Sequence, residues 1–102
     1  MPNYIIQFSA EAKKDLTNIF NYIFYSLNEP NIAKKKIEKI KLAIYNLKTN
    51  PEIYPIIQED ILSKYDLRKI VIDNHIIFYT VLNNTIYIVR ILYARRNWIS
   101  LL

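Results

Sequence analysis

The residues best suited to bind a charged partner are arginines, and all four of them fall after residue 67. They are Arg68, Arg90, Arg95 and Arg96. A planar guanidinium can donate two parallel hydrogen bonds to a phosphate or carboxylate, and it stacks on aromatic rings. Arg95 and Arg96 stand between two aromatic residues, a mixture typical of sites that bind nucleic acid or an acidic protein segment. The alternative is that these charges only protect a sheet edge from aggregation. From the clustering of arginines and aromatic residues near the end of the chain we predict a target-binding surface, made of Arg90, Tyr93, Arg95, Arg96 and Trp98.

His75 is the only histidine of the chain, and its ordinary pKa near neutrality suits a general base. The predicted strand that contains it also carries Tyr79 on the same face, so both are candidate proton carriers of a nuclease. A catalytic base is normally oriented by a third group, and the sequence offers none beside His75. Glu59 and Asp60 are adjacent in a predicted loop and do not form the spaced carboxylate pair of a hydrolase. We therefore interpret His75 as a strand-end residue without a chemical role.

The residue types that the chain lacks exclude most cofactor enzymes. It has no glycine, so it contains neither a glycine-rich phosphate loop nor a nucleophile elbow. It has no cysteine and a single histidine, which excludes disulfides, iron–sulfur clusters and two-histidine metal centres. We therefore expect no cofactor and no bound metal. No apolar run approaches the roughly 20 residues of a membrane span, so we expect a cytoplasmic protein without a membrane partner.

Length and charge narrow the remaining possibilities. A chain of 102 residues can hold one modest hydrophobic core, so we expect a single domain over residues 1–102. The formal net charge of +5 favours an acidic partner. Six lysines between residues 34 and 48 contribute strongly to this charge, and we interpret them as the solvated face of a helix.

The elements that position these residues follow from hydrophobic periodicity. Residues 3–8 alternate with a period of two and predict a short strand. Ser9 is a good N-cap for the helix that follows, in which apolar residues recur every three or four positions up to Leu27. Pro30 suits the first turn of a second amphipathic helix, which ends before Pro51. Because the connection is short, we expect an antiparallel helical hairpin.

From residue 67 onward the hydrophobic period falls to two and predicts strands at 67–72, 75–82 and 85–93. The turns at 73–74 and 83–84 need left-handed backbone, which we expect Asn to adopt in place of glycine. The tail predicts one helical turn that packs Trp98 back onto the fold. The expected fold class is α+β with the order βααβββ, a helical hairpin packed on one face of a small antiparallel sheet. We expect the other face to be open to solvent and to carry the function.

Several short motifs follow one another along the chain, each occurring once. They are Phe8 to Ala12, Asp15, Leu16, Ile19, Pro30, Leu47, Asn50-Pro51, Leu67-Arg68, His75 to Tyr79 and Ile88 to Asn97. In this arrangement the chain resembles the RelE/ParE superfamily of toxins from bacterial type II toxin–antitoxin systems, nearly from end to end. The resemblance implies a βααβββ fold and a cognate antitoxin whose C-terminal segment wraps the toxin.

The resemblance also implies one of two activities. RelE-like members cut mRNA in the ribosomal A site, so their partners are the ribosome and mRNA; here that chemistry would fall to Arg68, His75, Tyr79, Arg95 and Arg96. ParE-like members inhibit DNA gyrase and need no catalytic centre. Ile76 stands where RelE-like chains tend to carry an arginine, and the tail after Trp98 has no tyrosine. We therefore expect a gyrase-inhibiting toxin. The alternatives are a ribosome-dependent mRNA endonuclease and a non-toxic basic binding module.

Overall fold

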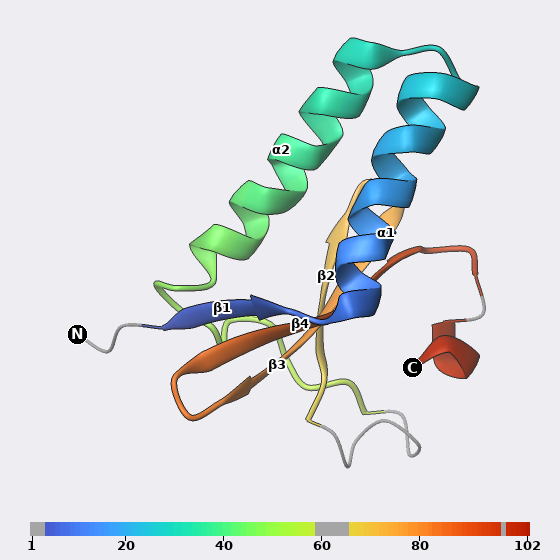
Figure 1. The fold of residues 1–102 in the computed structure, drawn as a ribbon. Helices are drawn as coiled ribbons and strands as arrows, with labels where there is room; N and C mark the ends of the chain where they lie inside the picture. Colours follow the sequence, from blue (N-terminus) through green and yellow to red (C-terminus); the bar gives the residue numbers. More distant parts are fainter. Residues whose placement is uncertain (1–3, 59–65, 97) are drawn as a thin grey trace.

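The computed structural model describes residues 4–58, 66–96 and 98–102. Figure 1 shows the elements in chain order: β1 (Ile5–Phe8), α1 (Ala10–Asn21), the π-helical turn η1 (Tyr22–Ser26), α2 (Pro30–Asn46), β2 (Arg68–Ile72), β3 (His75–Leu82), β4 (Thr85–Tyr93) and the 3-10 turn η2 (Trp98–Leu101). The predicted order βααβββ and the predicted C-terminal turn are confirmed. Glu59 and Asp60 lie outside the described residues.

The sheet is mixed, which corrects the expectation of an antiparallel one. Its strand order is β1-β4-β3-β2, and β2, β3 and β4 form the predicted antiparallel meander. β1 pairs with β4 in parallel, from Ile5 opposite Thr85 to Phe8 opposite Ile88. Parallel neighbours need a long connection between them, and the helical hairpin is part of that connection.

A β-bulge in β4 changes which side chains face the helices. Phe78 pairs with Arg90 and Tyr79 pairs with Ile88, so Val89 has no partner on β3. Ile88 and Ile91 consequently both belong to the core beneath the helices, although an odd spacing would put them on opposite faces of a regular strand. The bulge therefore sets the direction of the residues that end β4.

The helical hairpin covers one face of the sheet. Ser9 caps α1 by accepting a hydrogen bond from the Ala12 amide at 2.9 Å, and its hydroxyl donates to the Val89 carbonyl at 2.6 Å. The core beneath the hairpin consists of Ala12, Ile40, Ile44, Leu47, Ile70, Ile77, Tyr79, Ile86, Ile88 and Ile91. Figure 1 shows that the far end of the hairpin extends past the sheet. Within the described ranges, no helix is both long and apolar enough to cross a membrane.

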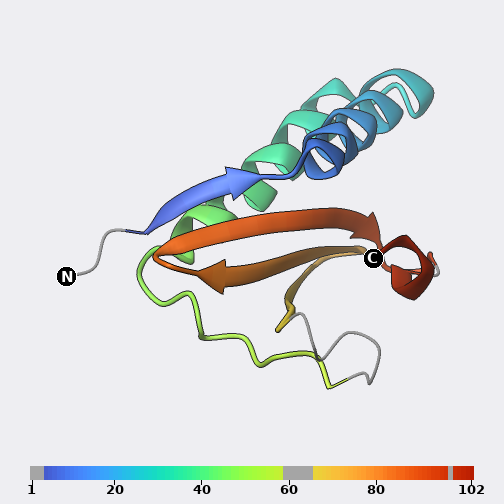
Figure 2. The same cartoon turned by 60° about the horizontal axis from the view of Figure 1, so that its bottom comes forward.

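The second face of the sheet is covered in part, so the expectation of an open face is wrong for that part, whereas Val71, Leu82 and Tyr87 on the same face are exposed. A second cluster on that face contains Ile57, Leu67, Ile76, Phe78 and Leu92, and Trp98, Leu101 and Leu102 pack against it. Figure 2 shows the segment after α2 on the side of the sheet opposite the helices. The C-terminal turn and this segment bury apolar side chains that a four-stranded sheet would otherwise expose on its second face.

The hairpin turns use left-handed backbone without glycine. Asn83 and Asn84 have φ values of 50° and 63°, as expected. In the turn between β2 and β3 the positive φ of 54° belongs to Asp73, which corrects the expectation of Asn there. A short polar side chain can stabilise this conformation by local hydrogen bonding, so Asp and Asn serve the same purpose.

Candidate functional site

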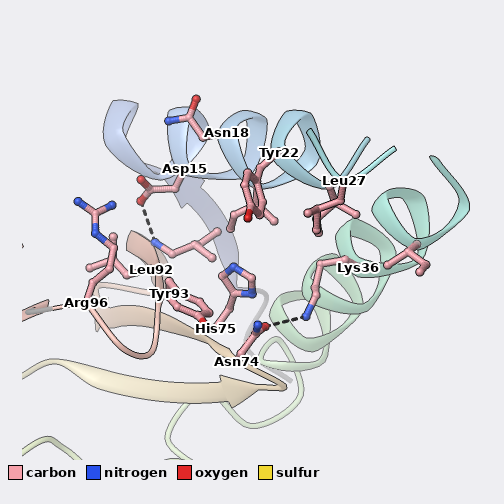
Figure 3. Close-up of a pocket in the computed structure, with 14 residues that line it drawn as sticks. Asp15, Asn18, Tyr22, Leu27, Lys36, Asn74, His75, Leu92, Tyr93 and Arg96 are labelled. Atoms are coloured by element: carbon pink, nitrogen blue, oxygen red, sulfur yellow. Dashed lines mark hydrogen bonds between the residues drawn. The ribbon is translucent and has the colours of Figure 1, made fainter. Parts of the chain in front are cut away.

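A groove lies where the helical hairpin extends past the end of the sheet (Figure 3). Its volume is about 690 Å³. α1 and η1 form one wall, and α2 contributes Ile32 and Lys36. His75 and the end of β4 line the other side. The groove therefore brings together residues from both halves of the chain.

The walls of the groove at the hairpin end are apolar and exposed. Tyr22, Leu27 and Ile32 are 58%, 50% and 52% exposed. The apolar stripe of the hairpin continues here beyond the sheet that would bury it. Contiguous apolar surface of this kind marks an interaction site rather than ordinary protein surface. Leu27 belongs to the predicted stripe of the first helix, whereas Tyr22 and Ile32 lie outside both predicted stripes. The extension of the hairpin beyond the sheet leaves no signal in the sequence.

A partly buried ion pair stands at one end of the groove. The Asp15 carboxylate accepts hydrogen bonds from Arg90 Nε at 2.8 Å and Arg90 Nη2 at 3.0 Å, and from the Ile91 amide at 2.9 Å. Arg90 Nη1 also donates to the Leu101 carbonyl at 3.2 Å. The hydrogen bond that Arg90 donates to Asp15 raises the pKa of Arg90, against the opposing effect of burial. The guanidinium of Arg90 is thus engaged within the fold, and its predicted contact with a target stays a prediction.

His75 lies at the floor of the groove. It is only 9% exposed, and its ring meets the Tyr93 ring edge-on at 5.7 Å between centroids. Burial lowers the pKa of His75, the positive charge of Lys36 lowers it further, and Asp73 opposes both. The imidazole is therefore neutral near pH 7.

The turn beside His75 is fastened to α2. Lys36 Nζ donates to Asp73 at 3.1 Å and to Asn74 Oδ1 at 3.2 Å, and Lys39 Nζ donates to Asp73 at 2.8 Å. These hydrogen bonds, from Lys39 and then from Lys36, lower the pKa of Asp73. Two of the six lysines that we interpreted as a solvated face therefore link α2 to the turn between β2 and β3.

Tyr79 and Arg68 are paired across β3 and β2, outside the groove. Tyr79 is fully buried and its hydroxyl donates to the Pro51 carbonyl at 2.8 Å. Burial raises the pKa of Tyr79 to about 12. Arg68 donates to the carbonyls of Glu52 and Tyr54. Both side chains thus secure the segment after α2. Tyr79 lies four residue steps along the strand from His75, which is roughly 13 Å.

The predicted target-binding surface is divided by the fold. Tyr93, which is 37% exposed, and Arg96 line the groove, and Arg95 is exposed beside them. Trp98 instead packs on Phe78 across the second face, with 5.2 Å between ring centroids, and Lys69 Nζ lies 5.5 Å from its ring. The structure therefore brings His75, Tyr93 and Arg96 together and places Trp98 apart. Among the described residues, no group of three acidic, histidine or cysteine side chains is arranged to hold a metal ion.

One family model matches most of the chain, and two solved structures share its fold. The family model for the ParE toxin of type II toxin-antitoxin systems, parDE, matches residues 6–98. A sequence search of curated proteins finds no match. A chain from the chromosomal ParDE toxin–antitoxin system of P. aeruginosa has a similar structure, with a TM-score of 0.76 and 16% identity over 93% of this chain and 100% of that one. A chain from the toxin-antitoxin complex RelBE2 of Mycobacterium tuberculosis is similar with a TM-score of 0.62 and 16% identity, over 91% and 93% of the two chains.

Proposed function

The chain belongs to the ParE toxin family of type II toxin–antitoxin systems, and from this we propose that it inhibits DNA gyrase and is neutralised by an antitoxin that docks in the groove. The match of the ParE family model over residues 6–98 carries the proposal. The ParE branch implies gyrase as the target and no catalytic centre. Because DNA gyrase acts in the cytoplasm, a toxin that inhibits it would act there too.

The chemistry of the groove fits an acidic amphipathic segment. Its apolar walls match the apolar face of such a segment, which would bury them from water. Among its charged side chains, Asp15 is neutralised by Arg90, and Arg96 adds a positive charge. Lys36 shares Asp73 with Lys39, so these two lysines and one carboxylate also leave one positive charge. The net charge of +5 favours an acidic partner over the whole molecule as well. We therefore assign the groove to the cognate antitoxin.

This placement also accounts for neutralisation. Tyr93 and Arg96 line the groove and belong to the predicted target-binding surface. An antitoxin in the groove would cover both side chains, so gyrase and antitoxin would compete for them. Arg95, exposed beside them, completes the proposed gyrase contact.

The arrangement of the nuclease candidates supports gyrase inhibition over mRNA cleavage. A nuclease needs a base and a phosphate-binding group within reach of one substrate. Tyr79 and Arg68 are engaged with the segment after α2 and line no part of the groove that contains His75. His75 Nδ1 has no hydrogen-bond partner among the described residues, so no carboxylate or carbonyl orients the ring as a base through that nitrogen.

Expression in bacteria tests the proposal. We expect the chain alone to arrest growth with loss of plasmid supercoiling, and co-expression of the protein encoded beside it to restore both. Leu27→Glu, which places a negative charge on the apolar wall, should prevent rescue while growth arrest remains. Unimpaired growth at high soluble expression would instead favour the non-toxic binding module. Arrest with normal supercoiling and cut mRNA would favour the endonuclease.

A further inference from the structure

His75 contains a buried polar atom that has no hydrogen-bond partner within the described part of the chain, its Nδ1. Buried polar groups in folded proteins are nearly always satisfied, so this exception requires a physical reason. Figure 3 shows the imidazole standing at the floor of the groove, between Tyr93 on β4 and Lys36 on α2. The unpaired atom therefore belongs to a residue that faces the proposed antitoxin site.

The unpaired Nδ1 indicates which nitrogen carries the proton. A neutral imidazole has one N–H donor and one acceptor nitrogen. Nδ1 has no partner in either tautomer, whereas Nε2 is not among the buried unpaired atoms, so a proton on Nε2 can be donated to water or to a ligand in the groove. A doubly protonated ring would add an uncompensated charge close to Lys36. The lowered pKa of His75, which burial causes first and Lys36 second, agrees with a neutral ring. We assign the proton to Nε2, which leaves that nitrogen a hydrogen-bond donor.

The ionisable groups around the ring favour a negatively charged acceptor. They are Asp15 on α1, Tyr22 on η1, Lys36 on α2, Asp73 in the β2–β3 turn, Tyr93 on β4 and Arg96 after it. Both carboxylates are already engaged, Asp15 by Arg90 and Asp73 by Lys36 and Lys39. Arg96 has no ion pair within the described ranges. A carboxylate entering the groove would therefore meet donors and positive charge.

We propose that His75 determines specificity in the groove by donating a hydrogen bond from Nε2 to a carboxylate of the docked antitoxin segment. This inference rests on the proposed function, since it needs the antitoxin in the groove. A carboxylate beside the ring stabilises the imidazolium, so the complex holds a proton more tightly than the free chain does. Affinity consequently rises as the pH falls through the pKa of His75 in the complex. The rise reaches about tenfold for each unit by which binding raises the pKa once the pH is below the pKa of His75 in the free chain.

Calorimetric titration with the protein encoded beside this chain tests the inference. At pH 8, His75→Gln keeps a side-chain donor and should bind within about threefold of the wild type. His75→Leu removes the donor and should bind about tenfold more weakly, since an unpaired carboxylate is left in the interface. Both variants should lose the rise in affinity at low pH. Leu42→Ala changes an exposed residue on the outer face of α2 and is the matched control, which should retain it.

Nuclear magnetic resonance of the single histidine supplies a second readout. We expect Nε2 to be the protonated nitrogen of the free chain at pH 7 and the pKa of His75 to rise in the complex. A proton on Nδ1, an unchanged pKa, or equal affinities for the Gln and Leu variants would overturn the inference while leaving the proposed function intact. A wild-type chain that does not bind the neighbouring protein would overturn both.

Discussion

The side chains of Asp15 and Arg90 join three parts of the molecule. Asp15 lies on α1, Arg90 on β4, and Arg90 also binds the Leu101 carbonyl in η2. The two side chains are 10% and 18% exposed, so each would leave a largely desolvated charge if the other were removed. The sequence carried one signal of this pair, an acid at position 15 within the apolar stripe between Ala12 and Ile19.

We expect Asp15→Ala to lower the free energy of unfolding by about 2 to 3 kcal/mol, because Arg90 and the Ile91 amide lose their acceptor. Urea denaturation at pH 7 measures the change. Lys39→Ala removes an exposed ion pair with Asp73 and should alter stability little. If Asp15→Ala costs no more than this control, the ion pair does not stabilise the fold.

His75 also predicts a pH dependence of stability. Its pKa is lower in the folded chain than the ordinary 6.5, so the unfolded chain binds a proton more readily. The stability linked to His75 is therefore complete above about pH 6.5 and is lost as the pH falls toward the folded value. Chemical denaturation from pH 7.5 to 5 should show this loss, with a shallower slope in His75→Gln. Identical slopes in the two proteins would mean that burial does not disfavour the charged ring.

The order of the helices and strands, and most of the residues at which they begin and end, could be predicted because the sequence signals for them are local. Ser9 and Pro30 mark helix starts, and the change of hydrophobic period marks the strands. The parallel pairing of β1 with β4, the bulge at Val89 and the covering of the second face depend on contacts between distant residues, such as Ser9 with Val89, 80 positions apart. Such contacts leave no periodic signal in the sequence.

The candidate site could be predicted only in part for the same reason. His75, Tyr93 and Arg96 were recognised from residue type, but their shared groove exists because the hairpin extends past the sheet. Trp98 was placed on the target-binding surface because it follows Arg96 closely in sequence. The chain turns after β4 and directs Trp98 to the second face instead, where it contacts Phe78.

The C-terminal turn is expected to contribute to stability through Trp98. Trp98→Ala should lower the free energy of unfolding by about 2 kcal/mol, less than for a fully buried tryptophan because the ring is half-buried over Phe78. Lys69→Met removes the charge over the ring and should cost about 0.5 kcal/mol. Thermal and urea unfolding measure both changes. Equal, small effects would show that the turn does not cover the second face in solution.

The two faces of the sheet differ in what covers them. The segment after α2 and the C-terminal turn cover part of one face of the sheet, whereas the hairpin on the other face leaves a groove beyond the sheet end. Arg96 lines that groove and is exposed, and the exposed Arg95 precedes it in the chain. This arrangement supports a toxin that acts by binding, with the antitoxin and the target competing for one region.

A gyrase supercoiling assay, run beside primer extension on ribosome-bound mRNA, tests the central claim most directly. The purified chain should inhibit supercoiling, leave the mRNA uncut and lose its effect when the antitoxin is added. Arg95→Ala combined with Arg96→Ala should abolish inhibition, since removing a desolvated charge from an interface costs about 2 to 5 kcal/mol. Lys34→Ala with Lys35→Ala removes the same charge from an exposed part of α2 and should inhibit like the wild type. Codon-positioned mRNA breaks with normal gyrase activity would contradict the account.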